Sequence, residues 1–339
     1  MKCLKKIKDE SVNCVVTSPP YWGLRDYGTA KWEGGDLECD HKIPWKNSNE
    51  LNAPCSLKTF ERIKARQKSY TNVCKLCGAK RIDQQLGLED TPDKYVENLV
   101  AVFRKVRRVL RDDGTIWLVL GDSYAANRGY QVPDNKHVDV GNSRGMKADK
   151  FGLKPKDLVG IPWRVALALQ ASGWWLRSDI IWHKANVMPS SVTDRCTNAH
   201  EHVFMLTKSA KYYFDAEAIK EPAAYAGQGR GGSTKRYEQN AAGMDNKIYD
   251  TRNKRDVWTI NTKPYRGWKK GQKHFAVFPV ALVEPCVRAG CPKGGVVLDP
   301  FMGSGTTGVV ALAEGRRFIG IDLKKEYFEM TKARLLTGK

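Results

Sequence analysis

The stretch that most constrains the fold lies near the C-terminus, at residues 295–322. An apolar run leads into the glycine-rich segment D-P-F-M-G-S-G-T-T, a helical pattern follows to about Glu314, and a second apolar run ends at Asp322. Strand, glycine turn, helix and strand in this order form a βαβ unit, whose two strands lie parallel in one sheet. The chain is therefore predicted to contain an open α/β sheet, which binds ligands at the carboxyl ends of its strands.

The glycine turn fits more than one nucleotide cofactor. Gly303, Gly305 and Gly308 spell G-x-G-x-x-G, and an acid follows about twenty residues later, as in nicotinamide dinucleotide enzymes. A dehydrogenase of this kind needs a second mononucleotide-binding half, and only residues 323–339 follow. A P-loop is excluded because no lysine follows the glycines. An NAD-dependent oxidoreductase therefore remains only a remote alternative.

A second motif lies close to the N-terminus, where an apolar run leads into T-S-P-P-Y-W at 17–22. Each proline fixes its own φ and holds the preceding residue extended, so the Ser18 hydroxyl and the Pro19 carbonyl form a preset pair of acceptors, with Pro20 stiffening the turn. Such acceptors can pull on the protons of an exocyclic nucleobase amine. Tyr21 offers an aromatic face to a base that has left its stack. The alternative is a buried strand that ends in a proline turn with a packing tyrosine.

Together the two motifs resemble those of the amino-group DNA methyltransferases that use S-adenosylmethionine. In that family S/T/D-P-P-Y is the catalytic motif and D-P-F-x-G-S-G-T-T the cofactor motif, and the order found here is the permuted (beta) arrangement. The resemblance implies a Rossmann-like α/β fold with a mostly parallel, doubly wound sheet in circularly permuted order. It implies catalytic roles for Ser18, Pro19, Pro20 and Tyr21. It assigns cofactor contacts to Asp299, Pro300, Phe301, Gly303, Gly305, Thr306, Thr307 and Asp322.

The expected reaction is methylation of a flipped base in duplex DNA. We prefer the N4 amine of cytosine, with the N6 amine of adenine as the alternative, because T-S-P-P-Y is commoner among the cytosine-N4 members of the resembled family. The neutral Ser18 hydroxyl can accept and donate, a capacity that suits both bases. Protein glutamine or RNA amines are rival substrates, since enzymes acting on them use a similar N-P-P-Y turn. A DNA-binding protein without activity is a further alternative.

The charge balance supports a nucleic-acid partner. The chain has 339 residues and a formal net charge of +20, so a polyanion is the first expectation. Double-stranded DNA is the expected partner, a cognate restriction endonuclease is a candidate second one, and the protein is expected to be a monomer or homodimer. No apolar run approaches the ~20 residues that span a bilayer, so no membrane association and a cytoplasmic location are expected.

A cysteine-rich segment at 39–80 separates the catalytic motif from the middle of the chain. It contains C-x-x-C followed by glycine, the spacing of a zinc knuckle, and a second Cys/His pair upstream that can complete a tetrahedral set. The predicted zinc ligands are Cys39, His41, Cys74 and Cys77, with Cys55 in reserve. A redox pair is the alternative, but the βαβ pattern that usually surrounds one is absent from the sequence here.

The composition changes at 216–273 to Gly, Asn, Lys, Arg and Tyr, and this segment is expected to recognise DNA. Its basic groups would neutralise phosphates and its aromatic rings would stack on unpaired bases. The candidates are Arg252, Lys254, Arg255, Arg266, Trp268, Lys269 and Lys270. A disordered basic loop is the alternative. The predicted domains are a catalytic core at 1–38, 81–215 and 274–339, a zinc-binding insertion at 39–80 and a target-recognition segment at 216–273.

Local signals predict the elements between the motifs. Thr91 and a following proline open a helix that Asp112-Asp113-Gly114 is expected to end, and a buried strand is expected at 115–120. Another helix is expected over 162–170. The tripeptide His200-Glu201-His202 lacks the H-E-x-x-H spacing, so no metal site is predicted there.

Overall fold

The computed structural model describes residues 3–23, 29–42, 73–83, 85–125, 152–223, 250–263 and 278–337. The chain forms two compact units. The larger comprises Met1–Arg25 and Leu86–Lys339, and the smaller comprises Asp26–Gln85. The insertion expected at 39–80 falls within the smaller unit. Among the helices of the described ranges, none is long and apolar enough to cross a membrane.

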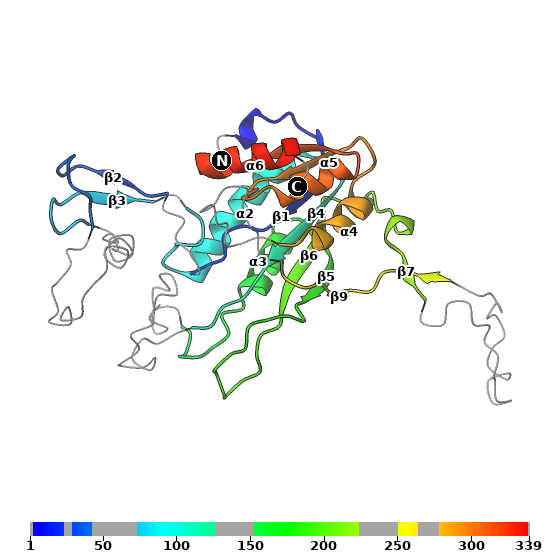
Figure 1. The fold of residues 1–339 in the computed structure, drawn as a ribbon, viewed down its shortest axis with the longest axis horizontal. Helices are drawn as coiled ribbons and strands as arrows, with labels where there is room; N and C mark the ends of the chain where they lie inside the picture. Colours follow the sequence, from blue (N-terminus) through cyan, green and yellow to red (C-terminus); the bar gives the residue numbers. More distant parts are fainter. Residues whose placement is uncertain are drawn as a thin grey trace. The chain divides into compact units, whose positions relative to one another are not determined.

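A seven-stranded sheet forms the centre of the larger unit (Figure 1). In spatial order its strands are β11 (Arg317–Gly320), β10 (Val296–Asp299), β1 (Val12–Thr17), β4 (Leu110–Leu120), β6 (His200–Thr207), β5 (Trp175–His183) and β9 (Val257–Thr259). Within this sheet only β6 runs antiparallel to its neighbours. The mostly parallel α/β sheet is therefore confirmed. Because β6 is reversed, its first residues lie at the same edge as the carboxyl ends of the other strands.

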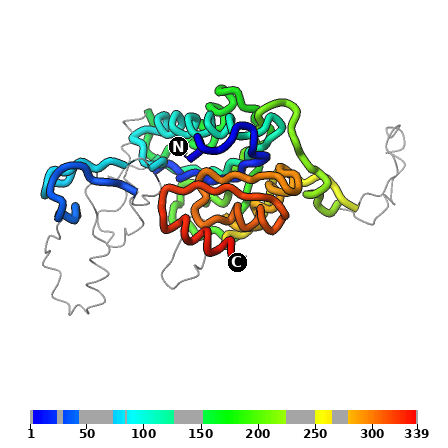
Figure 2. Tube along the Cα trace, turned by 90° about the horizontal axis from the view of Figure 1, so that it is seen from above, coloured from blue at the N-terminus to red at the C-terminus, as the bar shows by residue number. Residues whose placement is uncertain are grey.

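Helices cover both faces of this sheet. On one face α2 (Pro92–Val109) and α3 (Ile161–Ala171) pack on a core that includes Val15 and Ile116. On the other face α4 (Val280–Gly290) and α5 (Thr306–Ala313) pack on Val16 and Trp117. Figure 2 shows the cyan helix α2 and the orange helices on opposite sides of the blue strand β1. Successive side chains of β1 and β4 point to opposite faces of the sheet, and both faces are buried under helices.

The start of α2 follows from its sequence, while its end differs from the prediction. Thr91 caps the helix, since its side chain accepts a hydrogen bond from the backbone N–H of Lys94, 3.0 Å away. The helix ends at Val109, and β4 begins at once rather than at residue 115. Val12 pairs with Leu110 whereas Cys14 pairs with Thr115, so the residues expected to end the helix form a bulge within the strand.

Four shorter strands complete the regular structure of the described residues, with α6 (Lys325–Thr337) and two 3₁₀ helices, η1 (Leu4–Lys6) and η3 (Glu217–Ile219). In the smaller unit β2 (Lys31–Glu33) pairs antiparallel with β3 (Lys80–Ile82). In the larger unit β7 (Glu221–Pro222) pairs antiparallel with β8 (Thr251–Arg252), and both strands lie in the segment expected to recognise DNA.

Candidate active site

The two sequence motifs meet at the carboxyl edge of the sheet. Strand β1, which leads into the catalytic turn, pairs with β10, which leads into the glycine turn, with Val15 opposite Leu298. The carboxylate of Asp299 accepts hydrogen bonds from the Thr17 and Thr307 hydroxyls, at 2.6 and 2.8 Å. This carboxylate is 1% exposed, and burial raises its pKa to about 6. Asp299 therefore joins the two motifs from within the core.

The catalytic turn is held by hydrogen bonds on its backbone. Tyr95 of α2 donates its hydroxyl to the carbonyl of Pro20 at 3.0 Å, and Gly23 donates to the carbonyl of Gly87 at 2.8 Å. Trp22 is buried and donates its indole N–H to the carbonyl of Glu89. Within the described ranges no donor reaches the Pro19 carbonyl. Among the described residues, this carbonyl is thus left to accept a hydrogen bond from a substrate amine.

Tyr21 reaches across the end of β4 to the first residues of β6. Its hydroxyl donates to Glu201 Oε2 at 2.6 Å and accepts from the Ser18 hydroxyl at 3.3 Å, a long hydrogen bond. Lys184, which follows β5, donates its ammonium to Glu201 Oε1. Burial, followed by the Glu201 charge, raises the pKa of Tyr21 well above its ordinary value. The phenol therefore stays protonated and acts as the donor to Glu201.

The glycine turn is closed by Asp322 at the end of the next strand. Gly303 and Gly305 have φ angles of +49° and +77°, in the left-handed region that favours glycine. The Asp322 carboxylate accepts from the N–H groups of Gly303 and Lys324, at 3.0 and 2.8 Å. Burial raises its pKa above the ordinary value. A partly buried carboxylate beside a left-handed glycine turn fits an adenosyl cofactor, because its free lone pairs can accept from the ribose hydroxyls.

The remaining predicted cofactor residues are mostly enclosed by protein. Thr306 and Thr307 are buried, and the Thr306 hydroxyl accepts from Arg334 of α6 at 3.0 Å. Pro300 is buried beside them, and the N–H of Phe301 donates to Asp299. A β-carbon on Gly305 would lie 2.4 Å from Cγ2 of Thr331. A side chain at position 305 would therefore collide with Thr331 of α6. From the sequence, the expected reason for glycine here was the close approach of a ligand.

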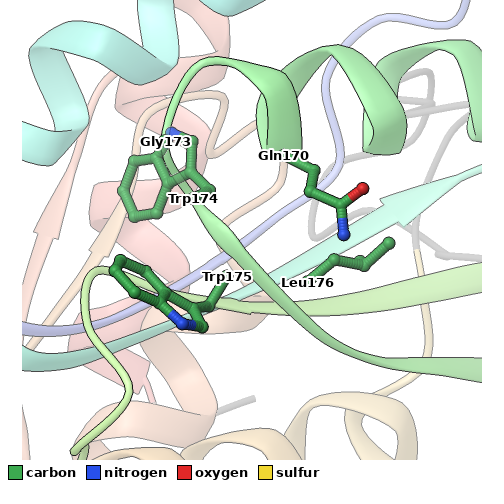
Figure 3. A pocket seen from close by; sticks show the side chains of 5 residues that line it. All are labelled: Gln170, Gly173, Trp174, Trp175 and Leu176. Carbon is green, nitrogen blue, oxygen red and sulfur yellow. The ribbon is translucent and has the colours of Figure 1, made fainter.

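A surface cavity of about 350 Å³ lies apart from this edge. It is lined by Gln170, Gly173, Trp174, Trp175 and Leu176 (Figure 3). These residues connect α3 to the beginning of β5, whereas the catalytic turn lies beyond the carboxyl ends of the strands. The cavity therefore takes no part in the candidate active site.

In the smaller unit, the four predicted metal ligands converge. One ligand atom from each of Cys39, His41, Cys74 and Cys77 lies within 4.8 Å of the others. The Sγ atoms of Cys39 and Cys74 lie 3.8 Å apart, and Cys77 Sγ lies 3.4 Å from His41 Nδ1. The Trp32 ring stacks on the imidazole of His41 with ring centroids 4.4 Å apart.

The backbone around these ligands forms a tight turn. Cys74 donates to the carbonyl of Ala79 and Gly78 donates to the carbonyl of Cys74, both at 2.8 Å. The backbone N–H of Ala79 also lowers the pKa of the Cys77 thiol. Gly78 adopts a φ of +74°, which explains why glycine follows the C-x-x-C pair.

Three of the predicted DNA-binding residues lie in the described part of the chain. Arg252 and Arg255 both donate to the same oxygen of Glu221, at 2.9 and 2.6 Å. The ammonium of Lys254 lies 5.1 Å from the centre of the Trp258 ring. The other candidates, Arg266, Trp268, Lys269 and Lys270, lie outside the described residues.

Glu201 and Lys184 are the site residues that sequence reasoning missed. In the sequence Glu201 stands between two histidines whose spacing is wrong for a metal motif, and no catalytic role is assigned to it. No local pattern connects it to Tyr21, which is 180 positions away. The missing information is the reversal of β6, which no local sequence pattern shows and which brings the acid at its start to the catalytic edge.

The order of the sheet and the junction of its two motifs define a Rossmann-like methyltransferase. Two solved structures share the fold. The PvuII DNA methyltransferase, described as cytosine-N4-specific, superposes with a TM-score of 0.53 at 18% identity, covering 99% of this chain and 89% of its own. TTHA0409 from Thermus thermophilus, in a structure complexed with S-adenosyl-L-methionine, superposes with a TM-score of 0.50 at 21% identity, covering 99% of this chain and 90% of its own.

Sequence comparison places the chain within this class. The DNA methylase family model matches residues 12–333. The Type II methyltransferase M.Cfr9I of Citrobacter freundii is 40% identical over 99% of this chain and 85% of its own length. The chain belongs to the DNA methylase family and is an S-adenosylmethionine-dependent DNA methyltransferase. The family predicted from the two motifs is confirmed, and its chemistry is methyl transfer rather than hydride transfer.

Proposed function

We propose that this enzyme methylates the exocyclic N4 amine of cytosine in duplex DNA after the base has turned out of the helix. The catalytic turn is the observation that carries the proposal, because it combines a neutral Ser18 hydroxyl with a Pro19 carbonyl that accepts no hydrogen bond from described residues. Two such acceptors suit the two protons of an amine. Adenine N6 is the second candidate, since its amine offers the same two protons.

The chain's own residues position the reactants. Ser18 Oγ and the Pro19 carbonyl accept from the amine and draw electron density toward its nitrogen, while the Tyr21 ring stacks on the base. Asp322 and the turn at Gly303 would hold S-adenosylmethionine, which supplies a methyl group activated by its sulfonium. Most of the rate enhancement is expected from this positioning, because the cofactor already carries the activated group.

The relatives support the choice of DNA, while the choice of cytosine rests on the catalytic turn. M.Cfr9I, which is 40% identical to this chain, is named a Type II methyltransferase. We accordingly propose that the protein acts in a restriction–modification system beside a cognate endonuclease. Arg252, Lys254 and Arg255, with the candidates at 266–270, are proposed to contact the DNA.

Nucleoside analysis tests the target base. Unmethylated DNA is incubated with the purified enzyme and S-adenosylmethionine, digested to nucleosides and separated by mass spectrometry. N4-methylcytosine is the expected product, and Ser18→Ala should form far less of it. N6-methyladenine without N4-methylcytosine would show that the base is wrong and that amine methylation is right. A product methylated only on carbon would contradict amine methylation altogether.

We also propose that the smaller unit holds one structural zinc ion through Cys39, His41, Cys74 and Cys77. A tetrahedral site with Zn–S bonds of about 2.3 Å has S–S distances of about 3.8 Å. The distance between the sulfurs of Cys39 and Cys74 is also 3.8 Å. Three sulfurs and one imidazole form a common structural zinc set, and the binding energy of such a site contributes to folding.

Elemental analysis tests the zinc proposal. Protein purified without chelators should contain about one zinc per chain, the stoichiometry of a four-ligand site. Cys74→Ser should lower this content, whereas Cys196→Ser, which alters an exposed cysteine elsewhere, should retain it. Wild-type protein free of zinc, or a Cys74–Cys77 disulfide found by peptide mapping, would contradict the proposal and favour a redox pair.

A further inference from the structure

A charged pair from two other strands holds the hydroxyl of the catalytic tyrosine. Glu201 is the second residue of β6 and pairs across the sheet with Trp182 of β5, while Lys184 follows β5 and donates its backbone N–H to Ala199. Strand β4 lies between β1 and β6, so the Tyr21 side chain must cross the end of β4 to reach Glu201. It does so over Gly121.

Gly121 leaves room for the Tyr21 ring because glycine carries no side chain. A β-carbon at this position would lie 2.7 Å from Cε2 of Tyr21 and 3.4 Å from Cδ of Glu201. Because the phenol oxygen lies on the long axis of the ring, its bond to Glu201 fixes the direction of that axis. The contact with Gly121 restricts rotation about the axis. Together the two contacts determine the orientation of the plane of the Tyr21 ring.

The charges also set the direction of the hydrogen bonds. An ionised carboxylate only accepts, so Tyr21 must donate to Glu201, and its oxygen then accepts from Ser18. The hydrogen of Ser18 is thereby turned toward Tyr21, which leaves the lone pairs of Ser18 Oγ for another donor. Lys184 neutralises the carboxylate, and both side chains of the pair are less than one-fifth exposed. Such an enclosed ion pair costs desolvation energy, so stability alone is a weak reason for it.

We infer that Glu201 and Lys184 are positioning residues that fix the plane of Tyr21 and keep Ser18 an acceptor toward the substrate amine. The inference rests on the proposed amine methylation. Glu201 acts through Tyr21, and Lys184 acts through Glu201. The hydroxyl of Tyr21 therefore contributes to the rate of the reaction, whereas a ring that only stacked on a base would not need it.

Single-turnover methylation of unmethylated plasmid DNA by the full chain tests this inference. Glu201→Gln and Tyr21→Phe should each lower the rate of methyl transfer by about 10-fold to 100-fold, the effect of one hydrogen bond to a charged acceptor. The dissociation constants for DNA and for S-adenosylmethionine should stay within about twofold, because the lost interaction acts on the reacting geometry. Tyr21→Phe combined with Glu201→Gln should be no slower than Tyr21→Phe alone, and Lys184→Met should add nothing to Glu201→Gln.

A matched control separates positioning from loss of stability. Glu314→Gln removes ion pairs with Arg288 on α4 and with Arg316, away from the catalytic turn, and should lower the melting temperature without lowering the rate. Wild-type rates in Glu201→Gln or Tyr21→Phe would overturn the inference, as would a double variant whose loss equals the product of the single losses. Nucleoside analysis of the wild-type product is read separately, so a failure of the proposed function is distinguishable from a failure of this inference.

Discussion

The carboxylate of Asp299 receives hydrogen bonds from three segments of the chain. The donors are the hydroxyl of Thr17 at the end of β1, the N–H of Phe301 in the glycine turn and the hydroxyl of Thr307 in α5. These donors offset only part of the cost of burying the charge, since the pKa remains raised from 3.8 to about 6. Asp299 thus lowers the stability of the folded state while it holds the two motifs in alignment.

This raised pKa predicts a pH dependence of stability. Between pH 3.8 and about 6 the folded state binds the Asp299 proton more tightly than the unfolded chain does, so the free energy of unfolding falls as the pH rises through this window. The shift corresponds to about 3 kcal/mol. In urea denaturation from pH 4 to pH 7, the free energy of unfolding of the wild type should fall relative to that of Asp299→Asn as the pH rises. A difference independent of pH would contradict the prediction.

Gly305 allows a second prediction at this scale. Alanine here must adopt a φ of +77° and bring its β-carbon within 2.4 Å of Thr331. Gly294 has nearly the same φ, +73°, but open space around it. Gly294→Ala therefore measures the backbone cost alone, and Gly305→Ala should destabilise the protein by about 1–3 kcal/mol more, the cost of overpacking. Equal losses in thermal unfolding would show that α6 moves aside freely.

At the scale of elements, α2 carries Tyr95, which holds the carbonyl of Pro20 in the catalytic turn. The first turn of this helix depends on the side chain of Thr91. Thr91→Ala should lower the free energy of unfolding by about 1 kcal/mol, and Thr91→Ser should recover most of this loss because serine also caps. Urea denaturation of the three proteins measures both values. Loss of stability in Thr91→Ser as large as in Thr91→Ala would indicate that packing of the threonine methyl matters more than the cap.

Elements specified by neighbouring residues could be predicted from the sequence. The prolines at 19 and 20 and the glycines of the cofactor turn restrict their own backbone, so both turns could be placed without knowledge of the sheet. The role of Glu201 could not, because it depends on the reversed pairing of β6 with β4 and β5. The limit of α2 at Val109 was missed for a similar reason, since a bulge opposite β1 absorbs the polar residues that normally end a helix.

At the scale of the whole molecule, the effect of the net charge of +20 on DNA binding depends on where the basic residues lie. In the described part of the target-recognition segment, Arg252 and Arg255 share the single carboxylate of Glu221. That pair therefore contributes about one net positive charge, while Arg255 remains exposed. The adjacent pair Lys269-Lys270, which has no acidic residue near it in the sequence at 264–273, lies outside the described residues.

DNA affinity should accordingly depend steeply on salt, because each neutralised phosphate adds about 0.9 to the slope of log affinity against log salt concentration. Replacing Lys269 and Lys270 together by alanine should reduce this slope by about 1 to 2, since two contacts are lost. The control replaces Lys5 and Lys6, an exposed pair on η1, and removes the same charge. Fluorescence anisotropy with labelled duplex across a salt series measures all three slopes. If the control flattens the slope as much as the test pair, affinity follows total charge and 269–270 does not contact the DNA.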